Sequence, residues 1–101
     1  MARRTLPNRR RGELMAFDHD GVCFTAQVSR FEDGSLAEVF LDAGKVGAGV
    51  DTMAKDAAVV LSIALQYGVP IETIKAALSQ ERDGTMRGPV GVLIQRMCER
   101  P

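Results

Sequence analysis

Cysteine and histidine are scarce in this chain of 101 residues, which has two cysteines and one histidine. Cys23 and Cys98 form neither a CxxC pair nor any other zinc-ligand spacing. His19 stands between two aspartates in a predicted turn, where a solvated histidine is commoner than a metal ligand. We therefore expect reduced, structural cysteines and no metal site, and no catalytic residue can be argued from these spacings.

A run of apolar residues long enough to span a membrane is also absent. The most apolar stretch lies near residues 50–67, but it is too short and contains Asp51, Lys55 and Asp56. The first residues include Arg3 and Arg4 in place of an apolar signal sequence. These features predict a cytoplasmic protein that does not enter the membrane.

Acidic residues are missing from the first eleven positions, which hold five of the thirteen basic residues. The remaining ninety residues carry eight basic and thirteen acidic side chains, a balance of −5. Residues 1–12 show no helical or strand periodicity and are interrupted by Pro7 and Gly12, so we expect them to form an extended basic arm. The length of the remainder suits one domain, residues 13–101.

Two segments are candidate binding sites for phosphate or for a partner protein. The arm offers the guanidinium groups of Arg9, Arg10 and Arg11, which could pair with phosphate oxygens, dock on an acidic surface or only solubilise the chain. The glycine-rich loop 44–49 offers Lys45 and the start of a helix, but it lacks the GK[ST] ending of a P-loop. Arg87 is the fifth candidate.

Residues 13–41 predict three antiparallel strands. The clearest alternation runs from Val22 to Ser29, with apolar residues on one face and Cys23, Thr25, Gln27 and Ser29 on the other. Asp18–Gly21 and Asp33-Gly34 supply turn residues on either side, and Asp33-Gly34 suits a tight hairpin with two positive φ angles. In the third strand Ala37, Val39 and Leu41 are expected to face the core, and Leu36 and Phe40 the outer side.

Three helices are predicted to follow these strands. The central one, near 50–67, has apolar residues at i, i+3, i+4 and i+7, and Val59, Val60 and Ile63 make its second half apolar on nearly every side. We therefore expect it to be buried between the sheet and further helix. Pro70 and Pro89 open the next two helices. The predicted fold is α+β, a three-stranded antiparallel meander followed by three helices packed on the sheet.

Three segments, read in order, resemble the TSCPD domain family. They are LPNRRRG at 6–12, FEDGSLAEVFLD at 31–42 and LSIALQYGVPIETIKAAL at 61–78. This family forms the C-terminal domain of adenosylcobalamin-dependent (class II) ribonucleotide reductases and also occurs as small free-standing proteins. The string Thr-Ser-Cys-Pro-Asp that names the family is absent here, and neither Cys23 nor Cys98 matches a catalytic cysteine.

The resemblance implies a role in deoxyribonucleotide synthesis, as an accessory or detached module that docks on a class II reductase catalytic chain. Adenosylcobalamin would then belong to that partner, and no cofactor is expected on this chain. Ribonucleoside-diphosphate reductase activity is the family's chemistry, but this chain has no room for a catalytic barrel and no redox cysteine pair. The alternatives are a small nucleic-acid or nucleotide-phosphate binder, disfavoured by the acidic body, and a homodimeric structural module joined through Leu36 and Phe40.

Overall fold

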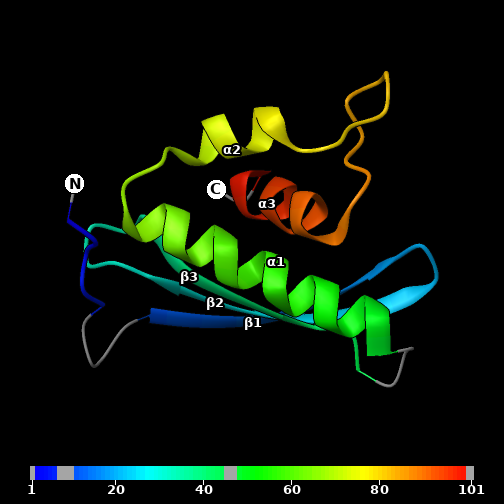
Figure 1. Cartoon of the computed structure of the whole chain (residues 1–101), viewed down its shortest axis with the longest axis horizontal. Helices are drawn as coiled ribbons and strands as arrows, with labels where there is room; N and C mark the ends of the chain where they lie inside the picture. The colour runs from blue at the N-terminus through cyan, green and yellow to red at the C-terminus, as the bar shows by residue number, and fades with distance from the viewer. Residues whose placement is uncertain (1, 7–10, 45–47, 100–101) are drawn as a thin grey trace.

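The computed structural model describes residues 2–6, 11–44 and 48–99. Its strands β1 (Arg11–His19), β2 (Val22–Arg30) and β3 (Leu36–Asp42) form one antiparallel sheet in the order β1-β2-β3. The helices α1 (Ala48–Gln66), α2 (Ile71–Ala77) and α3 (Pro89–Glu99) follow in the chain. Figure 1 shows all three helices on one side of the sheet. The predicted meander followed by three helices is confirmed.

The two hairpin turns differ from each other. Asp20 and Gly21 join β1 to β2 with φ angles of 51° and 74°, which is the two-residue turn that matches the twist of paired strands. We predicted two positive φ angles at Asp33-Gly34 instead. There the connection is longer, Gly34 alone has a positive φ of 88°, and the Phe31 N–H donates to the Ser35 carbonyl oxygen at 2.9 Å.

The core lies between the sheet and the helices and follows the predicted alternation. Phe24, Ala26 and Val28 of β2 are at most 2% exposed, and so are Val39 and Leu41 of β3. The helices complete this core with the following buried side chains: Ala54, Ala58, Leu61 and Leu65 from α1, and Val90, Leu93, Ile94 and Met97 from α3. In α2, Ile71 and Ile74 pack against this core but are only partly buried.

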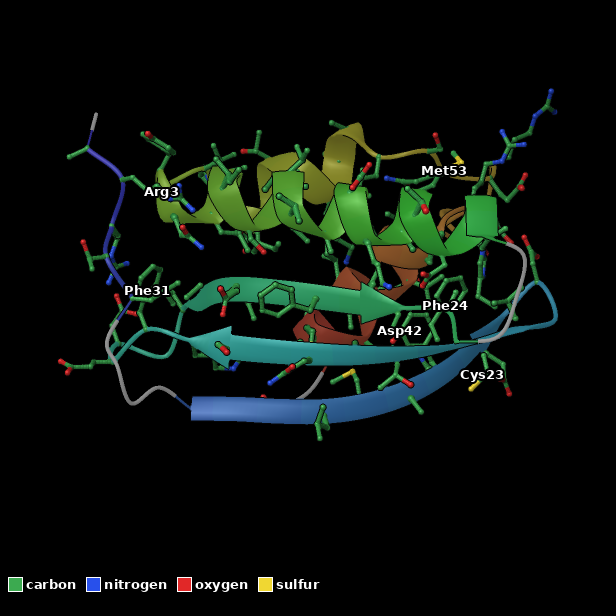
Figure 2. The ribbon with its side chains drawn as sticks, turned by 60° about the horizontal axis from the view of Figure 1, so that its bottom comes forward. Arg3, Cys23, Phe24, Phe31, Asp42 and Met53 are labelled. Carbon is green, nitrogen blue, oxygen red and sulfur yellow. The ribbon has the colours of Figure 1, made fainter. Side chains whose placement is uncertain are left out.

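The outer edge of β3 is closed by polar side chains of α1. The Ser62 hydroxyl accepts the Val39 N–H at 2.8 Å and lies 3.0 Å from the Val39 carbonyl oxygen. The Gln66 side-chain amide donates to the Ala37 carbonyl oxygen at 3.0 Å. Backbone groups on a buried edge must be paired, so these two buried side chains hold α1 in register beside β3. Figure 2 shows α1 running along that strand.

The outward face of α1 is not covered as we expected. Val59, Val60 and Ile63 are 46%, 67% and 38% exposed. The reason is that α1 packs beside the β3 edge through its polar side chains, while α3 packs next to it and not over it (Figure 1). One side of α1 is therefore buried and the other is an exposed apolar surface.

Replacement of Ser62 by Ala tests the closure of the β3 edge. The variant leaves the buried Val39 N–H without its acceptor, so we expect the free energy of unfolding to fall by about 1–3 kcal/mol. Urea unfolding measures the change, with Ser79→Ala, at an exposed position, as the control. Equal stability of both variants would contradict this account of the edge.

The start of α1 is held by Asp51, whose carboxylate lies 2.9 Å from the Lys55 ammonium and accepts the Ala43 N–H at 3.0 Å. The hydrogen bond from Lys55, followed by that from Ala43, lowers the pKa of Asp51 below its usual 3.8. A lowered folded-state pKa stabilises the protein above the unfolded value.

We therefore expect Asp51 to contribute stability at neutral pH that is lost as the pH falls below 3.8 and through the lowered pKa. Asp51→Asn should be less stable than the parent chain at neutral pH, and the difference should shrink in acid. Thermal unfolding across this range measures it, with Asp56→Asn as the control on the same helix. A difference that does not depend on pH would exclude the charge of Asp51 as its cause.

Candidate functional site

Arg3 and Arg4 dock the start of the chain on the end of α1. The Arg4 N–H donates to the Gln66 carbonyl oxygen at 2.7 Å, and Arg3 Nε donates to Gln66 Oε1 at 2.6 Å. Gln66 is 3% exposed, and its side-chain nitrogen holds Ala37 of β3. This glutamine therefore joins the N-terminal segment, α1 and the sheet. Figure 2 shows Arg3 beside the end of α1.

The Arg4 guanidinium contacts the turn between β2 and β3. Its central carbon lies 3.6 Å from the centroid of the Phe31 ring, and Nη2 lies 3.5 Å from Asp33 Oδ2. Hydrogen bonds from Ser35 are the main cause of the lowered pKa of Asp33, and the charge of Arg4 acts in the same direction. Asp33 is thus held as a carboxylate beside Arg4.

A groove of about 510 Å³ lies beside this contact, between the β2–β3 turn and the ends of α1 and α3. Its charged lining residues are two basic and two acidic ones, Arg4, Arg30, Asp33 and Glu72. Apolar side chains, including Leu65 and Met97, make up most of the rest of its lining. Arg30 Nε lies 3.3 Å from Glu13 Oε1, and its Nη1 donates to the Gly34 carbonyl oxygen at 2.9 Å. Arg4 and Arg30 are therefore already paired within the chain.

The opposite end of the sheet carries a second polar contact. His19 Nε2 lies 2.9 Å from the Arg87 carbonyl oxygen, and its side chain is only 17% exposed, so it is not the solvated histidine we expected. The Arg87 side chain reaches Glu81 Oε1 at 3.3 Å. A hollow of about 540 Å³ lies here between the β1–β2 turn, α1 and the segment before α3.

The structure places only two of the five predicted site residues, Arg11 and Arg87, and it does not bring these two together. Arg9, Arg10 and Lys45 lie outside the described residues. Arg11 is the first residue of β1, and the carbonyl oxygen of Arg87 contacts His19, the last residue of that strand. The two sites are therefore separated by the length of a nine-residue strand, about 26 Å. Arg3, Arg4 and Gln66 were not among the predicted site residues. The one signal in the sequence that could have indicated this contact is Gln66, a polar residue within a largely apolar helix.

The thiols and the outer face of the sheet also differ from expectation. Cys23 and Cys98 are free, as expected, but they are exposed and do not belong to the core. Leu36 packs against the core and not on the outer face, because the strand register shifts beside Ser29 and Arg30. Leu14, 75% exposed, is the apolar residue that shares the outer face with Phe40.

No group of three or more His, Cys, Asp or Glu side chains among the described residues could hold a metal ion. Within the same residues, no helix is long and apolar enough to cross a membrane.

The model of the TSCPD domain matches residues 3–97. The chain belongs to the TSCPD domain family. Its relatives include the vitamin B12-dependent ribonucleotide reductases of Agrobacterium fabrum, 39% identical over 70 residues, and Bradyrhizobium diazoefficiens, 33% identical over 70 residues. Each match covers 69% of this chain and 6% of the relative.

A third relative shows the same relationship. The vitamin B12-dependent ribonucleotide reductase of Streptantibioticus cattleyicolor is 32% identical over 80 residues, which cover 79% of this chain and 13% of the relative. The TSCPD chain thus spans only a small part of the curated relatives it matches. No solved structure gave a significant match.

Replacement of Arg4 by Ala tests the docking of the N-terminal segment. The variant loses the contacts with Phe31 and Asp33, so we expect a loss of about 1 kcal/mol in unfolding free energy. We also expect faster hydrogen exchange at the amide of residue 4. Arg82→Ala, in the exposed connector before α3, is the control. Unchanged exchange would show that the side chain does not hold the segment.

Proposed function

We propose that this TSCPD chain is an accessory module that docks on the catalytic chain of a vitamin B12-dependent ribonucleoside-diphosphate reductase and serves deoxyribonucleotide synthesis. The observation that carries the proposal is the family match over residues 3–97 together with the names of the relatives. The matched region is 6% of the reductase from Agrobacterium fabrum. A module that corresponds to so small a part of the reductase is suited to bind the catalytic chain and not to replace it. Adenosylcobalamin would remain on the partner reductase chain.

The arm and the outer face of the sheet are the surfaces we assign to this docking. The backbone of Arg11 pairs across the sheet with Arg30, which lines the groove of about 510 Å³, so the first residue of β1 lies beside that groove. Leu14 and Phe40 add exposed apolar area on the outer face, at 75% and 47% exposure. A partner surface with acidic residues beside an apolar patch would complement both features.

Simultaneous replacement of Arg9, Arg10 and Arg11 by Ala tests this assignment. We expect binding to a purified vitamin B12-dependent reductase chain from the same organism to be lost while the fold is kept, because the variant removes three charges from the arm. Surface plasmon resonance measures binding and circular dichroism measures the fold. A variant with Lys75 and Arg82 changed to Ala is the control for loss of positive charge elsewhere.

Undiminished binding by the triple variant would remove the arm from the mechanism. No binding by the parent chain would overturn the accessory role. Turnover of the reductase with and without the TSCPD chain then tells whether docking alters activity.

The second candidate is a nucleic-acid or nucleotide-phosphate binder that uses the arm with Lys45 and Arg87. The basic arm favours it, but Arg4, Arg30 and Arg87 are each paired with an acid of the same chain. Binding to phosphates by charge would weaken steeply as salt is raised. Binding to the reductase chain that persists at high salt would favour the accessory role.

A further inference from the structure

The outward face of α1 carries apolar residues at heptad spacing. Together with Tyr67, the residue directly after the helix, five of them follow one another at alternating steps of three and four residues. These six residues, hereafter the seam, are Val50, Met53, Ala57, Val60, Ala64 and Tyr67. Met53 and Val60 are 73% and 67% exposed, and Val50 and Tyr67 are 43% and 41% exposed. Ala57 is also exposed and Ala64 is half-buried. This spacing without a charged residue is that of a coiled-coil interface.

Large and small residues alternate along the seam in a way that suits an antiparallel copy of itself. A two-fold axis between positions 58 and 59 places Met53 opposite Ala64, Ala57 opposite Val60, and Val50 opposite Tyr67. Each layer then joins a larger side chain to a smaller one, as close packing requires. A parallel pair would instead set Ala57 against Ala57 and Met53 against Met53. The alanine layer would then leave a gap, and the methionine layer would be crowded.

The hollow of about 540 Å³ described above lies at the Val50 end of the seam. Val50, Met53 and Ala57 form one wall, and Leu78 and the segment before α3 form the other. His19 and Asp20 stand on its polar rim. In the antiparallel arrangement the partner subunit's Tyr67 comes to this end. A tyrosine ring suits an apolar hollow, and its hydroxyl suits a polar rim.

We propose that α1 binds a second copy of this chain through the seam, in antiparallel orientation, with Tyr67 of each copy entering the hollow of the other. The contact is small. A helix of 19 residues is about 28 Å long, and two such faces bury on the order of 1,000 Å², the lower limit for a specific interface. The dimer is therefore reversible and depends on protein concentration.

This inference does not rest on the proposed reductase partner. The seam lies on α1, whereas the docking surfaces assigned above are the arm and the outer face of the sheet. Purified protein alone tests the dimer, so its failure and the failure of the accessory role are distinguishable.

Sedimentation equilibrium over a range of concentrations is the first test. We expect the mass of two chains at high concentration and of one chain after dilution. Tyr67 is the sole tyrosine and the chain lacks tryptophan, so intrinsic fluorescence should change over the same dilution. A chain that stays monomeric at the highest concentration would overturn the proposal.

Val60→Lys and Leu14→Lys form a matched pair of variants, because both residues are largely exposed, one on the seam and one on the outer face of the sheet. We expect Val60→Lys to weaken the dimer by about tenfold or more and Leu14→Lys to leave it unchanged. The reverse result would place the interface on the sheet and refute the seam.

Disulfide cross-linking tests the orientation of the two copies. With Cys23 and Cys98 replaced by Ser, one protein carries Ala57→Cys and another carries Val60→Cys. We expect the mixture to cross-link faster than either protein alone, because positions 57 and 60 face each other only in the antiparallel register. Faster cross-linking of Ala57→Cys alone would indicate a parallel pair and contradict the proposal.

Discussion

The unpaired backbone edge of β3 determines how α1 lies in this fold. Strand β2 is paired with a strand on both sides, whereas β3, like β1, has a neighbouring strand on one side only. Ser62 and Gln66 bind backbone groups of Val39 and Ala37 on the other side. Because these two side chains must face the edge, the rotation of α1 about its axis is fixed. The apolar residues on its opposite side are therefore directed away from the core.

Gln66 links three parts of the chain that are distant in sequence. Its side chain holds β3 and Arg3, and its carbonyl oxygen accepts the N–H of Arg4. The basic segment thus reaches the sheet at the same end as the groove beside Phe31. A partner that displaced Arg3 or Arg4 would disturb the end of α1 as well, so contact with the arm is coupled to the packing of the domain.

Local sequence patterns predicted where the strands and helices lie better than they predicted which side chains are buried or in contact. The alternation in β2 identified its buried face, because a strand with one face in the core repeats every two residues. The apolar pattern of α1 identified the helix but not the exposure of Val60, since a side chain buried in the core and one on an exposed seam look the same in sequence. Likewise, the charge of the arm was evident, but the contact of Arg3 with Gln66 spans 63 positions and has no local signal.

The fixed rotation of the α-helix per residue also limits where the chain can gain or lose residues during evolution. One residue added to or removed from α1 between Asp51 and Gln66 rotates the rest of the helix by about 100°. Such a change would separate Asp51 from Ser62 and Gln66, so that they no longer face β3 together. The connector between α2 and α3 is fixed at its base by the bridge between Gln80 and Met86, but its exposed tip, residues 82–84, has no such constraint. Natural variants of this domain should therefore differ in length at the connector and keep the spacing within α1.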